Sequence, residues 1–166
     1  MTYRYDSYCG IYCGACLPLQ IAKRRDAAAR TQGRPLGELG EKECRGCKTD
    51  FVAKEWCLDC HFKKCCKDRG IEFCHECPDY PCDRYLESYN NHSSLAYHRL
   101  APVNLGRIQE AGLAAWLEAE SARWRCPACN TEVSFFDKAC GKCRTAVKDH
   151  NDQEKELGQR PAQPGT

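Results

Sequence analysis

Hydrophobic residues recur at helical spacing in two parts of this chain. In the first, Leu17, Ile21 and Ala28 form an apolar stripe, and Pro18 occupies the first turn, where a helix tolerates proline. The opposite side carries the basic residues Lys23, Arg24, Arg25 and Arg30. A glycine and a proline follow soon afterwards. We therefore predict a helix over residues 17–30 that leads into a loop at 33–43.

The second periodic stretch covers residues 104–124. Its apolar positions are Leu105, Ile108, Leu113, Trp116, Leu117 and Trp124. Gly106 and Gly112 weaken a helix, so one long helix and two shorter helices are both compatible with this pattern. We also predict a short helix over residues 83–89, followed by a turn at 90–94.

Composition limits how such helices can be stabilised. Only 42% of the residues are hydrophobic, and that share includes sixteen cysteines. The chain can therefore build only a small apolar core, so metal ions or disulfides must replace part of the missing burial. The sequence shows no apolar signal segment and no membrane-spanning run. We expect a cytoplasmic protein whose reduced thiols bind metal, with disulfides as the alternative in an oxidising compartment.

Twelve cysteines lie in close sets before residue 83, enough for three four-cysteine metal sites. They are Cys9, Cys13, Cys16, Cys44, Cys47, Cys57, Cys60, Cys65, Cys66, Cys74, Cys77 and Cys82. The two C-x2-C pairs within residues 44–60 can close one site, although Cys60 can also partner Cys65. We expect the adjacent Cys65 and Cys66 to serve different sites. His61 or His75 could replace a sulfur ligand.

A fourth set consists of Cys126, Cys129, Cys140 and Cys143. Two C-x2-C pairs at this separation are typical of a zinc ribbon, in which a short hairpin joins two metal-binding turns. Residues 131–136 supply one arm of that hairpin. We predict that this set binds one structural Zn²⁺ ion, whereas the earlier sites hold zinc or [4Fe–4S] clusters.

These elements predict a small, metal-stabilised fold that is α-rich and otherwise irregular. Residues 1–89 would form a cysteine-rich metal-binding module of knuckles and short helices. Residues 90–123 would form a helical connector, and residues 124–146 a zinc-ribbon-like module. Residues 147–166 are mostly polar, and we expect them to form a disordered tail.

The formal net charge of +2 counts every cysteine as neutral. Metal ligands bind as thiolates, so four divalent ions on sixteen thiolates would lower the charge by eight, to about −6. The basic residues beside the cysteines, which would offset this charge, are Arg45, Lys48, Lys63, Lys64, Lys67 and Arg69. Nucleic-acid binders concentrate a basic excess on one face. We therefore expect a protein partner, no strong nucleic-acid binding and no membrane association.

The spacing of Cys9, Cys13 and Cys16 matches the cluster loop of radical S-adenosylmethionine enzymes. Those enzymes repeat β–α units, and a complete barrel takes about 200 residues or more. This chain shows no β–α repeat, which also argues against thioredoxin-type chemistry at Cys44 and Cys47. No Ser–His–Asp set, phosphate-binding glycine loop or paired-carboxylate motif stands out. We therefore do not expect an enzyme.

Two functions remain. Zinc sites with four sulfur ligands are closed and structural, so the sequence favours a zinc-binding protein that acts as a binding or scaffold module. The alternative is an iron–sulfur protein for electron transfer or cluster delivery, because thiolates suit zinc and iron–sulfur clusters alike.

Several segments resemble one known family. They are the opening CGIYCGAC at 9–16, CRGC at 44–47, EFCHECPDYPC at 72–82, and the stretch from Ala111 to Cys143. They resemble the cysteine-rich domain-of-unknown-function family 3795, whose members start CGLYCG-x-C and carry an EFC-x-EC-x-x-x-PC segment. The resemblance covers most of residues 8–144. It implies iron–sulfur chemistry through the family's occurrence in anaerobic bacteria and archaea, but it implies no settled activity. Cys57 and Cys66 are additions to the family pattern.

Overall fold

The structure is a computed structural model that describes residues 2–31, 44–53, 55–89 and 95–157. Its helices are η1 (Cys13–Ala15, 3-10), α1 (Leu17–Thr31), α2 (Glu55–Leu58), α3 (His61–Arg69), η2 (Cys74–Glu76, 3-10), α4 (Asp83–Tyr89), α5 (Ala96–Ala111), α6 (Leu113–Arg123) and α7 (His150–Leu157). The described ranges contain no β-strand, only isolated antiparallel bridges. The prediction of an α-rich, otherwise irregular fold is therefore confirmed for these residues.

Two predicted helices are confirmed: α1 covers the periodic stretch that begins at Leu17, and α4 has the predicted bounds. The second stretch forms two helices rather than one. They separate at Gly112, whose φ of 83° ends α5, and α5 already begins at Ala96. No helix in the described ranges is long and apolar enough to cross a membrane. The predicted loop at 33–43 and the turn at 90–94 lie outside the described residues.

The apolar stripe predicted on α1 faces solvent, which corrects its expected role. Leu17 and Ile21 are exposed, whereas Leu19 and Gln20 are almost fully buried. Gln20 turns inward because its Nε2 donates hydrogen bonds to the carbonyl oxygens of Gly14 (3.1 Å) and Val133 (2.7 Å). Specific hydrogen bonds, rather than hydrophobic periodicity, therefore decide which face of α1 is buried.

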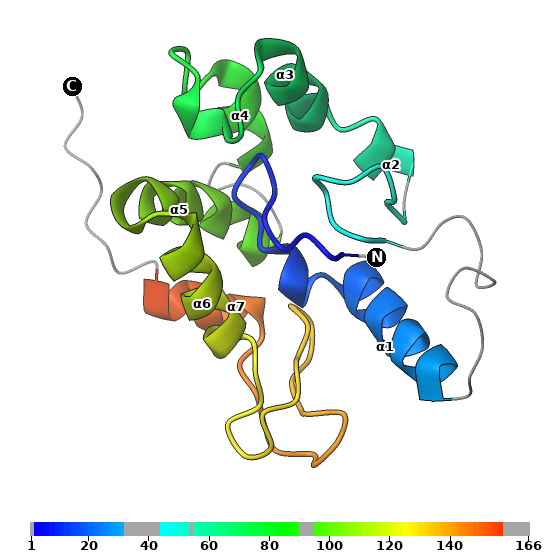
Figure 1. Ribbon diagram of the computed structural model, residues 1–166. Coiled ribbons are helices and arrows are strands. Elements are labelled where there is room, and N and C mark those ends of the chain that lie inside the picture. The colour runs from blue at the N-terminus through cyan, green and yellow to red at the C-terminus, as the bar shows by residue number, and fades with distance from the viewer. Residues whose placement is uncertain (1, 32–43, 54, 90–94, 158–166) are drawn as a thin grey trace.

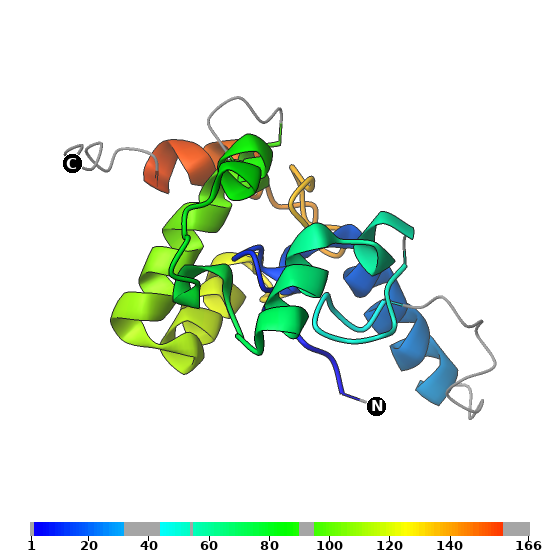
Figure 2. The same cartoon turned by 90° about the horizontal axis from the view of Figure 1, so that it is seen from above.

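The N-terminal segment passes through the middle of the molecule, between α1 on one side and α5 and α6 on the other (Figures 1 and 2). Distant elements bind its backbone. Tyr85 of α4 donates from its hydroxyl to the carbonyl of Cys9 (2.8 Å), and Asn104 of α5 donates to the carbonyl of Gly10 (2.9 Å). The opening CGIYCG motif is therefore a structural centre as well as a source of thiols.

The backbone conformation at Gly10 explains why the motif has a glycine at this position. Its φ is 94°, a conformation that L side chains rarely adopt. An added Cβ would overlap the carbonyl oxygen of Ala101 and lie 2.9 Å from Cγ of Leu105. Only glycine lets the N-terminal segment lie this close to α5.

One continuous core joins the segments that were expected to form separate modules. Its largest buried side chains are Tyr12, Phe62, Phe73, Tyr85, Tyr89, Leu105, Ile108, Trp116, Trp124, Val133 and Phe135. Aromatic contacts connect the parts: Tyr12 meets Trp116 edge-on, and Tyr97 stacks on Phe135 with ring centroids 4.5 Å apart. Residues from the N-terminal segment, the connector and the ribbon are therefore buried together.

The expectation of a disordered tail is wrong for residues 150–157, which form α7. Asp149 caps this helix by accepting hydrogen bonds from the backbone N–H groups of Asn151 and Asp152. An ion pair between Arg99 and Glu154 fixes α7 to α5. Capping and tertiary pairing thus order a polar segment that has little apolar surface of its own. Residues 158–166 lie outside the described part of the chain.

Candidate metal centre

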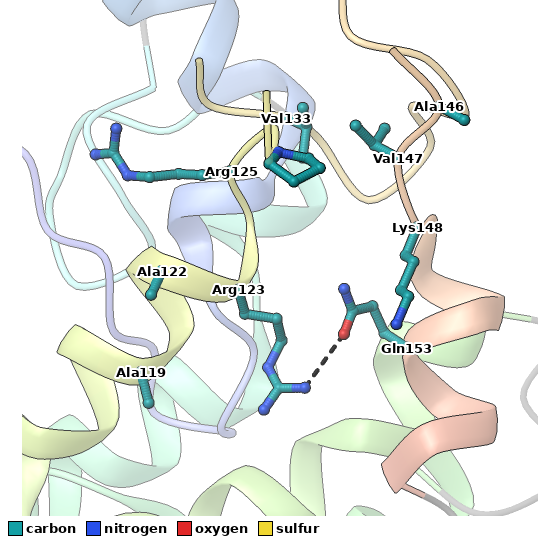
Figure 3. Close-up of a pocket in the computed structure, with 10 residues that line it drawn as sticks. Ala119, Ala122, Arg123, Arg125, Val133, Ala146, Val147, Lys148 and Gln153 are labelled. Atoms are coloured by element: carbon teal, nitrogen blue, oxygen red, sulfur yellow. Dashed lines mark hydrogen bonds between the residues drawn. The ribbon is translucent and has the colours of Figure 1, made fainter. Parts of the chain in front are cut away.

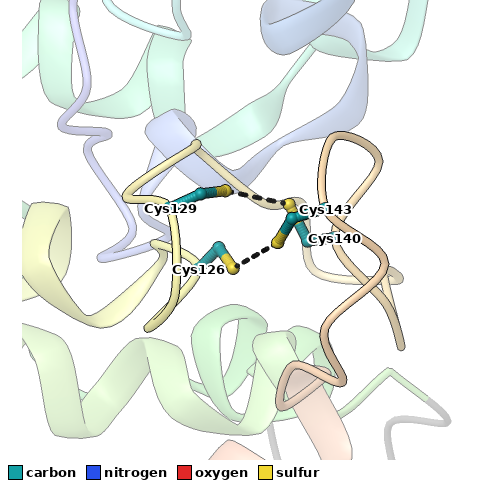
Figure 4. Close-up of side chains that lie close together, drawn as sticks. All are labelled: Cys126, Cys129, Cys140 and Cys143. Atoms are coloured by element: carbon teal, nitrogen blue, oxygen red, sulfur yellow. Dashed lines mark hydrogen bonds between the residues drawn. The ribbon is translucent and has the colours of Figure 1, made fainter.

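The four C-terminal cysteines converge as predicted (Figure 4). All four Sγ atoms of Cys126, Cys129, Cys140 and Cys143 lie within 4.8 Å of one another. The distance between the two Sγ atoms is 3.5 Å for Cys126 and Cys143, and also 3.5 Å for Cys129 and Cys140. Tetrahedral zinc with Zn–S bonds near 2.3 Å requires S–S separations of about 3.8 Å. This arrangement fits a single metal ion held by four thiolates.

The two halves of this ribbon repeat each other in detail. In the first half, the N–H of Cys126 donates to the carbonyl of Thr131 (2.8 Å), and that of Asn130 donates to the carbonyl of Cys126 (2.9 Å). In the second half, Cys140, Thr145 and Arg144 make the same two bonds at 2.8 and 3.0 Å. An antiparallel bridge flanks each turn, Arg125 with Glu132 and Ala139 with Ala146. Each C-x2-C pair is thus held in the same closed turn.

Thr131 and Thr145 are site residues that the sequence interpretation missed. Thr131 Oγ1 lies 3.2 Å from Sγ of Cys129, and Thr145 Oγ1 lies 3.3 Å from Sγ of Cys143. Contact with the Thr145 hydroxyl, followed by its backbone N–H, lowers the pKa of the Cys143 thiol to about 6. A hydroxyl can donate to a thiolate, so both threonines favour the metal-binding form. The signal was available as a repeated C-x2-C-x-T pattern.

The ribbon is anchored to the rest of the protein beside α1. The N–H of Phe135 donates to the carbonyl of Ala15 (3.0 Å), and Lys23 of α1 makes an ion pair with Glu132 at 2.7 Å. These bonds come from the turn and helix that follow Cys13. The residues that hold the C-terminal centre in place therefore lie next to the first cysteine motif.

Five of the N-terminal cysteines gather at the start of α1, and we call them the α1 cysteine cluster. They are Cys13, Cys16, Cys44, Cys47 and Cys57. Cys13 and Cys44 are buried together, and Cys47 packs against them. A hydrogen bond to the Cys47 thiol, followed by burial, raises the pKa of the Cys13 thiol. Burial, followed by the nearby charges of Cys47, Cys44 and Cys57, raises the pKa of the Cys16 thiol to about 12. The C-x2-C pairs at 13–16 and 44–47 therefore face each other, with Cys57 beside them.

The remaining N-terminal cysteines gather around α3, and we call them the α3 cysteine cluster. They are Cys9, Cys60, Cys65, Cys66, Cys74, Cys77 and Cys82. Five of them, Cys65, Cys66, Cys74, Cys77 and Cys82, line one small cavity with aromatic walls that include Phe62 and Tyr85. Sγ of Cys66 lies 3.8 Å from Sγ of Cys74, Cys9 is buried in the same core, and Cys60 packs against it.

The sequence interpretation of the N-terminal cysteines can be compared with their positions in the structure. The twelve thiols lie near α1 and around α3, and their division into three sites of four stays a prediction. The adjacent Cys65 and Cys66 line the same cavity, and the expectation that they serve different sites stays a prediction. Both lie on α3, a helix that the sequence interpretation did not predict. His61 lines the same cavity, and His75 stacks on Phe73, so their role as ligands stays a prediction.

The basic residues beside the cysteines have mixed roles. Arg69 donates from Nη1 both to Sγ of Cys77 (3.0 Å) and to the carboxylate of Asp79 (2.9 Å). Lys48 pairs with the carboxylates of Asp6 (2.9 Å) and Glu72 (3.0 Å) and lies over the ring of Phe73. It therefore ties the Cys44–Cys47 turn to the segment around Cys74. Arg45, Lys64 and Lys67 also pair with carboxylates.

The three gatherings differ in geometry. Among the described residues, which include all sixteen cysteines, only the ribbon set has at least three candidate ligand atoms within 4.8 Å of one another. The α1 and α3 cysteine clusters are more open, although each supplies at least four thiols. The chemistry available to all three is soft, anionic metal binding.

Comparison with known proteins identifies one family. A family model described as "Protein of unknown function (DUF3795)" matches residues 5–87. The match begins before Cys9 and ends beyond Cys82, so it contains both the α1 and the α3 cysteine clusters. No curated protein and no solved structure matches the chain significantly. The chain thus belongs to the family of proteins of unknown function called DUF3795.

Proposed function

We propose that this protein is a zinc-stapled binding or scaffold module whose ribbon holds one structural Zn²⁺ ion. The observation that carries the proposal is the convergence of four thiols within 4.8 Å. Four protein ligands complete the tetrahedral coordination of zinc and leave no position for a substrate or water. Such a site supplies folding energy rather than catalysis.

Removal of the metal tests this proposal. Zinc-loaded protein should show the well-dispersed NMR signals of a folded protein. A strong chelator should remove the zinc, and the signals of residues 124–146 should then lose their dispersion. Adding zinc back should restore them, because metal binding and ribbon folding are coupled. A ribbon that keeps its spectrum after the metal has left would contradict a structural role for zinc.

The partner that we propose is another protein. Support comes from α1, where the apolar side chains of Leu17 and Ile21 are exposed beside the basic residues Arg24 and Arg25. Exposed apolar surface next to charge is typical of protein interfaces. Fluorescence anisotropy with mixed-sequence DNA and RNA at physiological salt should show only weak binding. Submicromolar binding that weakened on neutralising Arg24 and Arg25 would favour nucleic acid instead.

A second candidate function is iron–sulfur chemistry in the N-terminal part. The observation that favours it is the cavity lined by five thiols, in which Sγ of Cys66 and of Cys74 lie 3.8 Å apart but no three described thiols converge as they do in the ribbon. The thiolates that bind a four-iron cluster sit at its separate corners, so they stand farther apart than the ligands of one zinc ion. When bound, such a cluster would supply one-electron redox chemistry.

Anaerobic purification separates the two candidates. An iron–sulfur protein should be brown, with broad visible absorption and matched amounts of iron and acid-labile sulfide. Colourless protein that contains only zinc after anaerobic purification and anaerobic iron–sulfide reconstitution would exclude this second function and leave the scaffold.

A further inference from the structure

The N-terminal segment binds both C-x2-C pairs of the α1 cysteine cluster. The N–H of Cys13 donates to the carbonyl of Tyr5 (2.7 Å), and the N–H of the preceding residue, Arg4, donates to the carbonyl of Arg45 (2.8 Å) inside the second pair. An added Cβ at Gly46 would lie 2.0 Å from the carbonyl oxygen of Arg4, so this contact is close. Two neighbouring residues thus place the two cysteine pairs side by side.

A buried ion pair fixes the second pair to α1. Arg45 pairs with Asp26 of α1, and each residue is only 6% exposed. The hydroxyl of Tyr3 donates to the same carboxylate. Loss of either charge would leave the other unpaired in the core, so the ion pair strongly favours this arrangement. Because α1 begins directly after Cys16, the ion pair also fixes Cys16 relative to the second pair.

The sulfur atoms of the two pairs meet between these supports. The thiols of Cys13 and Cys47 are hydrogen-bonded to each other, and Cys44 is buried in the same small cluster as Cys13. The charges that act most strongly on the Cys16 thiol are those of Cys47 and Cys44. Within the described residues these four sulfurs converge less closely than those of the ribbon. Rotation about one side-chain bond moves a cysteine sulfur, so the backbone positions decide which thiols can share an ion.

Backbone N–H groups are directed at these sulfurs, as in a zinc knuckle. Those of Gly46 and Ala53 act on the sulfur of Cys44, and that of Leu19 acts on the sulfur of Cys16. N–H groups around a thiolate orient it toward the metal and stabilise its charge. The backbone of both pairs is therefore arranged for anionic sulfur.

A buried lysine matches the charge of such a site. Lys63 of α3 is 6% exposed, and its Nζ donates to the carbonyl of Thr49 (2.5 Å), shortly after the second pair. Its positive charge acts on the thiols of Cys47 and Cys57. Four thiolates on one divalent ion leave two negative charges, which would stabilise an ammonium group buried beside them.

Cys57 is the fifth thiol of the cluster, but it lies on a different element. It belongs to α2, and its C-x2-C partner Cys60 packs against the core around α3. A C-x2-C pair in a zinc site gives both of its sulfurs to one ion, as the two pairs of the ribbon are placed to do. The two complete pairs of the α1 cysteine cluster therefore fit one ion better than any set that includes Cys57.

We propose that the α1 cysteine cluster holds a second structural Zn²⁺ ion, bound by Cys13, Cys16, Cys44 and Cys47, and that Cys57 is not a ligand. This second site rests on the proposed function, because it extends the zinc scaffold from the ribbon to α1. It differs from the sequence interpretation, in which the pairs within residues 44–60 close one site.

The second site and the ribbon are in contact. Gln20 of α1 donates to the carbonyl of Val133 (2.7 Å), a ribbon residue whose side chain lines the cavity between the ribbon and α6 (Figure 3). A substitution in one site can therefore disturb the other. The ligands of each ion are best identified in the wild-type protein.

The test uses the full-length protein loaded with cadmium-113, a soft divalent ion that replaces zinc in thiolate sites. Scalar coupling between the metal and the Cβ protons of cysteine identifies the ligands of each ion by NMR. We expect one ion coupled to the four cysteines of the second site and another coupled to the four of the ribbon. An ion that couples to Cys57 together with Cys44 and Cys47 would overturn the proposal.

The same spectrum separates the two sites. A ribbon ion without an ion shared by the two N-terminal pairs would overturn the second site and leave the proposed function intact. The reverse result would contradict zinc in the ribbon and support the second site.

Zinc counting by native mass spectrometry, after loading in the presence of a competing chelator, gives an independent test. The double variant Cys16→Ser/Cys47→Ser should bind one zinc ion fewer than the wild-type protein, because both residues hold the same ion. Cys57→Ser is the matched control and should bind the wild-type number. Dispersed NMR signals from the ribbon would show that each variant is folded. An unchanged count in the double variant, or a lost ion in Cys57→Ser, would overturn the proposal.

Discussion

Asn130 and Arg144 occupy the same position in the two halves of the ribbon, one residue after the second cysteine of each pair. Their φ angles are 58° and 64°, and among the described residues they are the only non-glycine residues with positive φ. Asparagine tolerates this left-handed conformation, whereas arginine does so at a cost of roughly 1–2 kcal/mol. The turn therefore requires a positive φ at this position in both halves. The first half meets the requirement with asparagine at little cost, and the second half with arginine at a greater cost.

Arg144→Gly should stabilise the ribbon. Glycine adopts positive φ without steric cost, and the gain, reduced by its greater freedom in the unfolded chain, should be about 0.5–1 kcal/mol in the free energy of unfolding. Lys142→Gly is the control, because Lys142 has no positive φ and should lose about as much. Chemical denaturation of the zinc-loaded proteins measures both. An equal loss in the two variants would show that the repeated turn does not strain Arg144.

Phe135 and Phe136 are adjacent but should differ greatly in their contribution to stability. Phe135 is 4% exposed, stacked on Tyr97 and edge-on to Trp124, whereas Phe136 is 49% exposed. We expect Phe135→Ala to lower the free energy of unfolding by about 3–5 kcal/mol and Phe136→Ala by less than about 1.5 kcal/mol.

The same pair tests whether the ribbon and helices share a core. Hydrogen exchange of Phe135→Ala should show faster amide exchange in α5 and α6 as well as in the ribbon. Faster exchange confined to residues 124–146 would support the expected division into independent modules.

Gly10 and Gly106 form a second contrasting pair. Gly10→Ala should cost at least about 2–3 kcal/mol and loosen the N-terminal segment from α5, because the new methyl group overlaps Ala101 and φ is positive. Gly106 lies within α5 with open space around its Cα hydrogens, so Gly106→Ala should stabilise the protein by about 0.5–1 kcal/mol. Thermal unfolding curves would show shifts of opposite sign. Equal shifts would mean that the Gly10 contact does not exist in solution.

The packing of α7 on α5 should weaken in acid. Burial lowers the pKa of His150, whose ring lies against Tyr97 and Phe136. The charged groups near it are Asp149, Arg99 and Glu154. Burial, followed by the charge of His150, also lowers the pKa of His98. A folded-state pKa below the unfolded value means that the unfolded chain binds the proton more readily. Stability is therefore complete above the unfolded pKa near 6.5 and falls as the pH drops below it.

His150→Phe isolates this effect, because phenylalanine fills a similar space and cannot be protonated. We expect the variant to gain stability relative to the wild-type protein as the pH is lowered from about 7.5 to about 5.5. We compare the thermal unfolding of the two proteins at each pH. The difference between them excludes the pH dependence that comes from the thiols, because both proteins contain the same thiols. A stability difference that does not change with pH would exclude His150 as the cause.

Local sequence signals predicted much of the fold and of the C-terminal centre. The prolines and glycines at its two ends predicted where α1 lies, and Gly112 separates the two helices of the second stretch. These residues affect the backbone conformation wherever they occur. The spacing of Cys126, Cys129, Cys140 and Cys143 likewise specifies a local turn geometry. Such features depend on neighbours along the chain, so the sequence alone reveals them.

The missed features depend on contacts between distant residues. α3 contains few apolar residues and is stabilised by burying Phe62 and Cys66 against the core. α7 needs Arg99, which is 55 positions away from Glu154 in the sequence. The inward face of α1 is set by partners such as Val133, and the positions of the N-terminal thiols depend on how α1 and α3 pack. Periodicity and spacing contain no information about these partners.

The most direct test of the account is the number of zinc ions bound by wild-type protein and by Cys126→Ser, counted by native mass spectrometry after identical zinc loading. If the ribbon holds zinc through four thiolates, the variant binds one zinc ion fewer, and Cys129, Cys140 and Cys143 become open to alkylation only in the variant. An unchanged zinc count, with these three thiols equally reactive in both proteins, would contradict a four-thiolate zinc site in the ribbon.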